Sequence, residues 1–453
     1  MRSANVAVVG AGPAGLYSAA DLVRRSDAVV DVIDRVPAPF GLVRYGVAPD
    51  HPRIKGVVKN LQRVLEHERV RFIGNVEFGR DIDRGFLDEH YDATIYATGA
   101  LHSKPLGVEG ERLPGSWSAS RFVSWYNGHP DAEAHFVLEA SAAAVVGAGN
   151  VALDVARVLT RSVGSLALTD IPCSVLESIA ASRIRDVHIV CRRGAAEAKF
   201  TTKELLDLRE LADVGVVVDP ADLADIRADD LDGPVLANVD LFRAWAANRD
   251  AERAERRRIH FHFWSRPVAI TGASQVEALR VERTGVVDGE FAGTGEFRTL
   301  PVEMVLSSVG YRSSPLPGLP FEPERGILPN VAGRVIGDDG RHIPSLYVAG
   351  WLKRGPQGVI GTNRTDAAET VSALLEDLAE ARNRPGRGAE AAGERLRERG
   401  VEVVDYRGWQ RIDEHEQQRG RDLGRARVKI TAWAELRAIG AGLSTAEAGS
   451  RSR

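Results

Sequence analysis

Short apolar runs that are followed by glycine, and then by apolar residues at helical spacing, recur along this chain. The first run covers residues 6–9; Gly10 follows it, and apolar residues then repeat at helical spacing over 16–23. A second apolar run covers 29–33 and ends at Asp34. Continuous apolar runs predict strands buried on both faces, and the helical spacing predicts amphipathic helices. Their alternation predicts an α/β fold with mostly parallel sheets.

The same patterns place further elements along the chain. We predict a helix over 54–67, a strand over 70–73, and a strand that begins at Tyr91 and ends before a glycine turn. Residues 225–315 are expected to be rich in strands, because apolar and polar positions alternate in several parts of this range. A helix is predicted over 366–378, and residues 401–440 are expected to be ordered.

Composition narrows the class of protein. The chain has 453 residues, which at about 150 residues per domain suggests two or three domains. Its hydrophobic content of 44% and charged content of 27% are ordinary for a soluble globular protein. A net charge of −4 gives no overall attraction to nucleic acid. Because no apolar run approaches the ~18 residues of a membrane helix, we expect no membrane insertion.

The two cysteines and the N-terminal pattern bear on the cellular compartment. Cys173 and Cys191 lie far apart and form no C-x-x-C pair, which excludes a dithiol redox site of the usual spacing. The chain begins with a predicted strand, turn and helix, and not with an apolar signal segment. Both observations favour a cytoplasmic protein.

The first glycine loop has the spacing G-x-G-x-x-G between a buried strand and a helix. In such a loop the first glycine permits a tight turn, the second lets the backbone approach a pyrophosphate, and the third lets the helix pack closely. An acidic residue about 20 residues further on holds a ribose, and Asp34 stands there. The alternative is a plain α/β turn in which glycine serves only packing. The candidate dinucleotide-binding residues here are Gly10, Gly12, Pro13, Ala14, Gly15 and Asp34.

A second glycine loop repeats the pattern as G-x-G-x-x-A, after an apolar run over 142–146. Two such units are far less probable by chance than one, so they predict two Rossmann-like dinucleotide-binding domains, one of them inserted in the other. The candidate residues of the second loop are Gly147, Ala148, Gly149, Asn150 and Val151.

The second unit ends differently at its ribose position. The strand expected over 187–191 is followed by Arg192 and Arg193, and no carboxylate stands there. Guanidinium groups bind phosphate oxygens in pairs, so these arginines favour NADP over NAD. They come much further past the glycines than usual, which requires an inserted segment over about 162–182. The alternative interpretation of the pair is a solvated strand end.

Other charged and polar residues carry weaker signals. Glu204 lies near the start of a predicted helix, where a carboxylate suits the helix dipole without any function. His260 and His262 alternate with phenylalanines, so both face one side of a strand, but no third ligand follows at a suggestive spacing and we expect no metal site. A basic run over 253–258 is most simply a solvated face.

Several longer motifs resemble those of the adrenodoxin reductase-like family of ferredoxin–NADP reductases. They are the first glycine loop, Pro39-Phe-Gly-Leu-Val-Arg-Tyr-Gly-Val-Ala-Pro-Asp-His51-Pro, the segments 97–100, 146–154, 191–194 and 200–205, and Ala349-Gly-Trp-Leu-Lys-Arg-Gly-Pro-Gln-Gly-Val-Ile-Gly361. The resemblance covers about residues 4–440, nearly the whole chain.

This resemblance implies an FAD domain made from both ends of the chain, with an NADP domain inserted between. We therefore predict FAD-binding parts at 1–104 and 315–453, the latter with a C-terminal extension, and an NADP-binding domain at 105–314. FAD would contact Ala14, Asp34, Leu42, Val76, Trp351, Gly358, Val359 and Ile360, and we add the strand-end residues Thr98, Gly99 and Gly350. Asp34 replaces the Glu of many relatives. NADP(H) would contact Ala148, Gly149, Asn150, Val151, Arg192, Arg193, Glu204 and Gly358.

The resemblance also implies a reaction. NADPH would give a hydride to the flavin, which would release electrons singly to a ferredoxin-type iron–sulfur partner, and this partner in turn is expected to feed a cytochrome P450. His51 and Glu204 would tune nicotinamide placement without transferring protons. Because ferredoxins are acidic, a basic docking patch is required, to which residues 253–258, or Lys353 and Arg354, would contribute.

Three rival functions share parts of this pattern. A flavin-dependent monooxygenase has both glycine loops and hydroxylates a bound substrate. A glutamate-synthase-type reductase subunit normally brings an N-terminal cysteine-rich region, which is not found here. A flavin-binding subunit without catalytic activity would have no need of Arg192 and Arg193.

Overall fold

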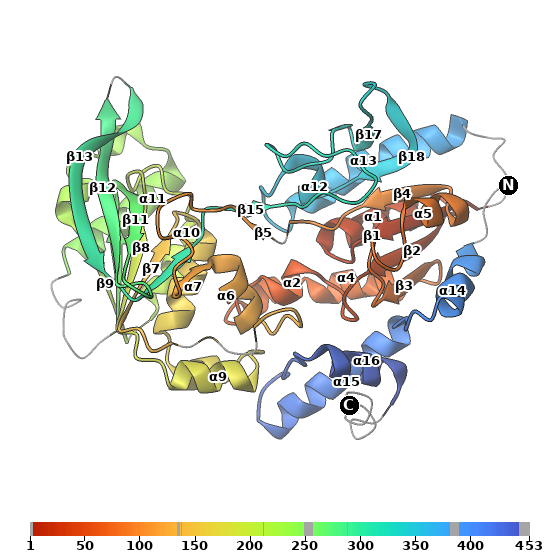
Figure 1. Ribbon diagram of the computed structural model, residues 1–453, viewed down its shortest axis with the longest axis horizontal. Helices are drawn as coiled ribbons and strands as arrows, with labels where there is room; N and C mark the ends of the chain where they lie inside the picture. The colour runs from red at the N-terminus through yellow and green to blue at the C-terminus, as the bar shows by residue number, and fades with distance from the viewer. Residues whose placement is uncertain are drawn as a thin grey trace.

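Two lobes make up the computed structural model, and a pair of short strands joins them (Figure 1). The structure describes residues 3–100, 102–133, 136, 138–211, 213–248, 257–287, 289–380 and 389–443. The chain crosses to the second lobe at β5 (His102–Ser103) and returns at β15 (Tyr311–Arg312), and these two strands pair antiparallel. The predicted boundaries after 104 and 314 fall close to these crossings.

The first lobe contains a seven-stranded sheet in the order β16-β17-β18-β4-β1-β2-β3. Strands β1 to β4 and β18 run parallel to one another, whereas β16 and β17 form an antiparallel edge that pairs with β18. All five residues of β1 are buried, as expected of a strand covered on both faces. The strands are β1 (Asn5–Val9), β2 (Val29–Asp34), β3 (Val70–Gly74), β4 (Ala93–Tyr96), β16 (Asn330–Val331), β17 (Arg334–Ile336) and β18 (His342–Val348).

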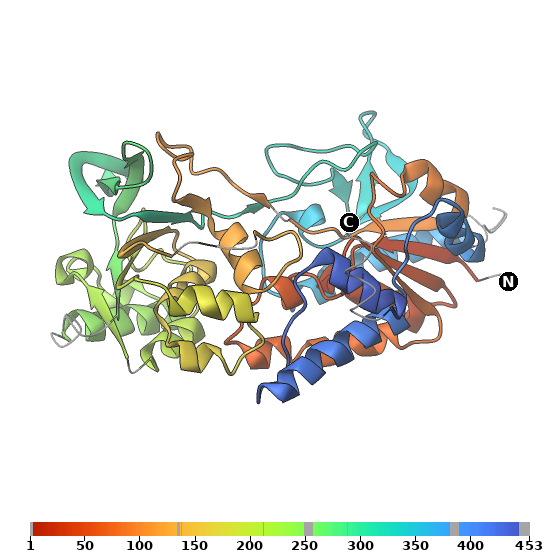
Figure 2. The ribbon, with the colours of Figure 1, turned by 60° about the horizontal axis from the view of Figure 1, so that its bottom comes forward.

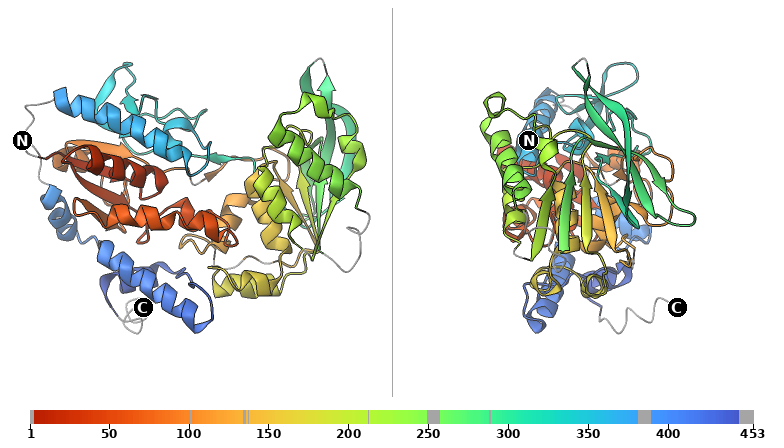
Figure 3. Two further views of the ribbon diagram at one scale, coloured as in Figure 1. Left: turned by 180° about the vertical axis from the view of Figure 1, so that it is seen from behind. Right: turned by 90° about the vertical axis from the view of Figure 1, so that its left-hand side faces the viewer.

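Helices cover this sheet, and α1 and α13 pack side by side although one precedes the crossing and the other follows the return (Figure 3, left). The first-lobe helices before the crossing are α1 (Pro13–Arg25), α2 (Leu42–Tyr45), α3 (Pro52–Lys55), α4 (Val58–Leu65) and α5 (Arg84–His90). Those after the return are α12 (Trp351–Arg354), α13 (Thr362–Glu380), α14 (Ala389–Glu398), α15 (Tyr406–Asp422) and α16 (Trp433–Ala441). Helices α15 and α16 lie below the sheet of the first lobe (Figure 1) and reach toward the second lobe (Figure 2).

The second lobe contains a six-stranded parallel sheet in the order β6-β14-β7-β8-β10-β9. A three-stranded antiparallel sheet packs against one of its faces through an apolar core (Figure 3, right). The parallel strands are β6 (Ser116–Ser118), β7 (Ala142–Val146), β8 (Asp186–Val190), β9 (Val214–Val218), β10 (Arg257–His262) and β14 (Met304–Ser307). The antiparallel strands are β11 (Ser265–Thr271), β12 (Ala278–Val287) and β13 (Glu290–Pro301).

The opposite face of the parallel sheet packs against helices. They are α6 (Ala119–Tyr126), α7 (Asn150–Thr160), α8 (Val163–Leu166), α9 (Cys173–Ala180), α10 (Thr202–Arg209) and α11 (Gly233–Ala246), with 3₁₀ turns at Pro220–Leu223 and Ala228–Asp230. The expected insertion over 162–182 is present as α8 and α9. Among the described residues, no helix combines the length and the apolar character that crossing a bilayer requires.

Three predicted elements differ from the structure. The range 225–315 contains α11, because Asp232 caps the helix by accepting from Val235 N and a proline stands in its first turn. The helix expected over 54–67 is two helices, α3 and α4, separated at Gly56. The helix expected to begin at 366 begins earlier, at Thr362.

Candidate functional site

The first glycine loop joins β1 to α1 at the carboxyl edge of the first sheet. Gly10 has a φ of +117°, and a Cβ there would lie 2.4 Å from the Ala97 carbonyl oxygen at the end of β4. A Cβ on Gly15 would lie 1.9 Å from the Gly10 carbonyl oxygen. Glycine is therefore required for the turn at Gly10 and for the close approach of α1 at Gly15.

The second glycine loop joins β7 to α7 in the same way. Gly147 has a φ of +154°, and a Cβ there would lie 2.4 Å from the Ser308 carbonyl oxygen at the end of β14. Its backbone N–H donates to Val190 O at 3.0 Å, just as Gly10 N donates to Ile33 O at 2.7 Å. The two loops are thus built on the same plan, one in each lobe.

The middle glycine of each loop lacks such a packing reason. Gly12 and Gly149 precede α1 and α7, and neither helix has an acidic residue in its first turn. A Cβ on Gly12 would approach only Gly41 Cα, at 3.9 Å, and a Cβ on Gly149 would meet nothing within 4 Å. The space in front of each helix N-terminus is therefore left open by the chain itself. This arrangement fits the phosphates of a dinucleotide, which would bind the free N–H groups there.

Asp34 ends β2 beside the first loop. One carboxylate oxygen accepts from Ala11 N at 2.7 Å and the other accepts from Val36 N at 2.9 Å. Burial raises the pKa of Asp34, although these two N–H groups oppose the shift. The side chain stabilises the glycine loop and lies where the ribose of a bound dinucleotide is expected.

Arg192 and Arg193 follow β8 next to the second loop. The buried Cys191 directly follows this strand, and its thiol lies 3.7 Å from Gly147 O. Arg192 is exposed and Arg193 is half-buried. Asn150, in the second loop, accepts from Thr201 N at 2.9 Å and so connects the start of α7 to the start of α10.

The segment from Gly350 to Ile360 lies against the first loop. Gly350 has a φ of +73°, and a Cβ there would lie 2.6 Å from Ala14 Cβ, so glycine lets this segment reach α1. The Trp351 ring lies 5.5 Å from the ring of Tyr311, which is in the crossing strand β15. Gly358, Val359 and Ile360 form the turn before α13, and Val359 is 69% exposed.

The remaining candidate residues on this side lie near the same edge of the sheet. Phe40 N donates to Ala11 O at 2.9 Å, which places Leu42 and α2 beside the first loop. Val76 is buried, and its N–H donates to Asp34 O at 3.0 Å. Thr98 and Gly99 follow β4 after one intervening residue, Ala97.

His51 and Glu204, far apart in sequence, meet between the two lobes. His51 precedes α3 in the first lobe, and its Nε2 lies 3.0 Å from a carboxylate oxygen of Glu204 on α10. The same nitrogen lies 3.0 Å from Asp154 on α7. Both His51 and Glu204 are buried. Burial opposes a charged His51, but the hydrogen bonds to Asp154 and Glu204 prevail and raise its pKa to about 9.

The sequence did not single out three further residues of this cluster, which are Asp50, Asp154 and Arg157. Arg157 is 1% exposed; its Nε lies 2.5 Å from Asp50, and its Nη2 lies 2.6 Å from Asp154. Burial opposes the charge on Glu204, but the hydrogen bond from His51 and the charge of Arg157 lower its pKa. An available signal was the Asp154–Arg157 pair, three residues apart on a helix whose other positions between Val151 and Leu159 are apolar.

Two further sets of candidate residues lie apart from this cluster. His260 and His262 face one side of β10, as predicted; they lie 2.7 Å from Asp186 and 2.8 Å from His188, respectively. Lys353 is 7% exposed and pairs with Glu369 at 2.6 Å, so the suggestion that it docks a partner at the surface is wrong. Residues 253–256 lie outside the described residues.

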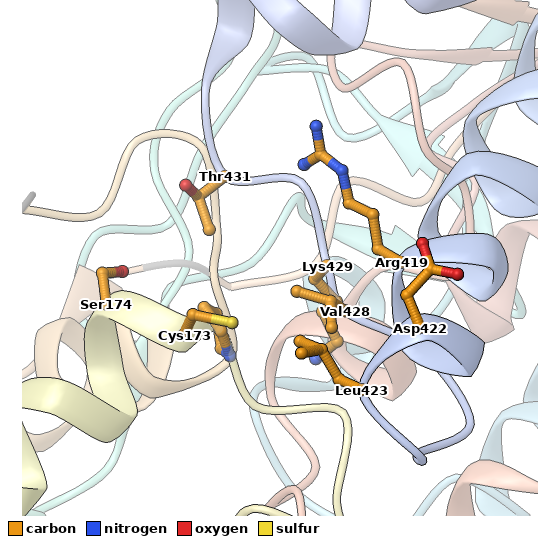
Figure 4. Close-up of a pocket in the computed structure, with 9 residues that line it drawn as sticks. Cys173, Ser174, Arg419, Asp422, Leu423, Val428, Lys429 and Thr431 are labelled. Atoms are coloured by element: carbon orange, nitrogen blue, oxygen red, sulfur yellow. The ribbon is translucent and has the colours of Figure 1, made fainter.

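The structure also has a separate hollow of about 410 Å³ between α9 and the end of α15 (Figure 4). Cys173 and Ser174 line one side of it and Arg419, Asp422 and Lys429 the other. It lies outside both glycine loops, so it is not part of the candidate dinucleotide sites.

Comparisons with known proteins match this geometry. Residues 4–213 match the family model described as pyridine nucleotide-disulphide oxidoreductase. The NADPH-ferredoxin reductase FprA of Mycobacterium tuberculosis is 43% identical over 98% of this chain and 100% of its own length. The mitochondrial NADPH:adrenodoxin oxidoreductase of Arabidopsis thaliana is 39% identical over 97% of this chain and 96% of its own. The chain belongs to the NADPH-ferredoxin and adrenodoxin reductase family.

A solved structure of this reductase family agrees over the whole chain. The complex of M. tuberculosis FprA with NADPH superimposes with a TM-score of 0.91 and 42% identity, and covers 97% of this chain and 100% of that one. The Rossmann-like arrangement of two lobes predicted from the two glycine loops is thus confirmed. The resemblance noted in the sequence motifs is confirmed as family membership.

Proposed function

We propose that this chain is a flavoprotein reductase that passes electrons from NADPH through FAD to a ferredoxin-type iron–sulfur protein. The observation that carries the proposal is the presence of two glycine loops of one plan with different ribose ends. The first ends at Asp34, whereas the second ends at Arg192 and Arg193. A carboxylate suits a ribose hydroxyl and a pair of guanidinium groups suits a 2′-phosphate.

The first lobe would hold the flavin nucleotide. The open space at Gly12 and the N-terminus of α1 would receive its pyrophosphate, and Asp34 would hold its ribose. The Gly350 segment and the turn at Gly358–Ile360 would cover it from the side of α13. Bound FAD supplies the step between a two-electron donor and a one-electron acceptor.

The second lobe would bind NADP(H). The space at Gly149 and the N-terminus of α7 would receive the pyrophosphate, and the two arginines would bind the 2′-phosphate. His51 and Glu204 would fix the relative position of the lobes, and with it the placement of the nicotinamide. Because each already has a charged partner within hydrogen-bond distance, we assign them positioning roles and no proton transfer.

The acceptor side of the proposal rests on the relatives' names and on chemistry. Relatives are named for ferredoxin and adrenodoxin, and an acidic carrier of this kind requires basic groups near the flavin. We extend the proposal to a cytochrome P450 as the consumer of the reduced carrier. We also place the protein in the cytoplasm, because Cys173 and Cys191 are both free thiols and a reducing compartment keeps them so.

One absorbance experiment tests the proposal. The purified protein should be yellow, and NADPH should bleach it without oxygen faster than NADH does. Reduction of cytochrome c should then require an added ferredoxin and should fall steeply with salt, because docking is electrostatic. A colourless protein would contradict the flavin part of the proposal. Electron transfer that does not depend on salt would contradict the electrostatic docking part.

The rival functions predict different outcomes in the same absorbance assay. A monooxygenase would oxidise NADPH faster when its organic substrate is added and would not need a ferredoxin. A flavin-binding subunit without activity would be yellow and would not bleach with NADPH. Replacement of Glu204 by Gln should lower the bleaching rate only modestly; complete loss with the flavin retained would contradict the positioning role.

A further inference from the structure

A long hairpin of the second lobe is attached to the turn that carries the two arginines. The hairpin consists of β12 and β13, and Thr284 of β12 donates its hydroxyl to Arg192 O at 2.6 Å. Thr284 N donates to Trp264 O at 2.9 Å, and Trp264 N donates to Arg193 O at 3.1 Å. The hairpin therefore holds the backbone of both arginines at the carboxyl edge of the sheet.

The same hairpin contacts the side chain of Arg193. The ring of Phe291, near the start of β13, lies 4.3 Å from the Arg193 guanidinium carbon. The ring of Phe291 also lies 6.1 Å from the ring of Trp264. Trp264 has a φ of +50°, which costs backbone energy and indicates that its position is imposed by the surroundings. A guanidinium over an aromatic face is held in orientation while its N–H groups stay available.

The contact contributes little to folding as such. Phe291 is 42% exposed, so burial of its ring stabilises the lobe only weakly. Arg193 Nε is a buried donor for which the described residues supply no acceptor. A buried donor without an acceptor is costly, and a bound anion would satisfy it.

We propose that Phe291 is a specificity-determining positioning residue that holds Arg193 for the 2′-phosphate of NADP(H). The inference rests on the proposed use of NADPH and adds the residue that orients one of its two arginines. A nucleotide with a 2′-hydroxyl gains nothing from an oriented Arg193, whereas a 2′-phosphate gains a charge-assisted hydrogen bond. Phe291 therefore raises the preference for the phosphorylated nucleotide.

The hairpin contains a matched control. Phe297, also on β13, lies 4.4 Å from the guanidinium carbon of Arg280 and is 51% exposed. Its geometry and exposure resemble those of Phe291, but its partner is not one of the two arginines that follow β8. Its removal should change the hairpin to a similar degree without touching Arg193.

The test measures binding of 2′,5′-ADP and of ADP to the flavin-loaded full chain by calorimetry. Phe291→Ala should weaken the binding of 2′,5′-ADP about two- to fivefold, which is the range of a partly exposed cation–π contact, and should leave the affinity for ADP unchanged. Phe291→Leu keeps apolar bulk without an aromatic face and should show the same loss. Phe291→Tyr should restore wild-type affinity, and Phe297→Ala should change neither ligand.

Equal weakening of both ligands by Phe291→Ala would overturn the inference, as would an equal effect of Phe297→Ala or wild-type affinity in Phe291→Leu. Melting temperatures and the visible spectrum identify a variant that has failed to fold, and Phe291→Leu then decides the question. If the wild-type protein binds 2′,5′-ADP no better than ADP, the proposed use of NADPH fails instead. The two failures are therefore distinguishable.

Discussion

The ammonium group of Lys429 lies 3.1 Å from the carboxylate of Asp170 and connects the C-terminal segment of the first lobe to the second lobe. Lys429 is 1% exposed; it also donates to Arg44 O at 3.0 Å and to Asn127 O at 3.1 Å. Lys55 contacts the same carboxylate at 2.7 Å. Burial favours the neutral form of Asp170, but the two ammonium groups prevail and lower its pKa.

Replacement of Lys429 by Met should destabilise the protein. The substitution leaves the buried Asp170 with one cation, and it leaves the carbonyl oxygens of Arg44 and Asn127 without this donor. Removing one partner of a buried ion pair costs on the order of 3 kcal/mol. Urea unfolding followed by flavin fluorescence measures the change. Lys59→Met, at an exposed position of α4, is the control and should have no comparable effect. Equal stability of the two variants would contradict the assignment.

The stability of the protein should depend on pH through His51. Its pKa is raised to about 9 from an ordinary value of 6.5, so the folded state binds the proton more tightly. The stabilisation is therefore complete below about pH 6.5 and is lost as the pH rises through about 9, by on the order of 2–3 kcal/mol. Melting curves at several pH values should show this loss in the wild type and in His102→Gln, whose altered residue is exposed, but not in His51→Gln. If the melting temperature depended on pH in the same way in the wild type and in both variants, the assignment of this dependence to His51 would be refuted.

Alanine at the middle glycines should separate ligand binding from folding. Gly149→Ala should leave the fold and the flavin in place and weaken NADPH about tenfold or more, equal to about 1.4 kcal/mol. Gly12→Ala should fold but lose flavin on gel filtration, because the new methyl group enters space that the chain leaves open. Gly10→Ala should fail to fold, since its Cβ would lie 2.4 Å from Ala97 O. Full flavin retention by Gly12→Ala would argue against a cofactor at the first loop.

The two thiols should differ in reactivity. Cys173 is exposed and faces the hollow beside α9, whereas Cys191 is buried, and burial raises the pKa of its thiol. A chromogenic disulfide reagent should therefore titrate one thiol in the native protein and two after denaturation. Cys173→Ser should abolish the native signal; a fast native reaction in that variant would show that the Cys191 site opens readily.

The fold could be predicted where a local pattern decides it. The alternation of apolar runs and helical spacing predicted both parallel sheets, and the spacing of Gly10, Gly12 and Gly15 predicted the first loop. The cluster around His51 could not be predicted in full. Arg157 lies on α7 of the second lobe and Asp50 in the first, and their contact depends on how the lobes pack. Only the resemblance to a known family singled out His51 and Glu204.

The crossing between the lobes makes the second lobe a removable module. Ser103 and Tyr311 are paired neighbours in β5 and β15, so the chain leaves the first lobe and re-enters it at one place. Neighbouring strands lie about 5 Å apart, a gap that a short turn can bridge. A chain shortened in this way would keep the first sheet, α1 and α13 continuous in space. The first lobe, on the flavin side, is thus a continuous fold without the second lobe that is inserted into it.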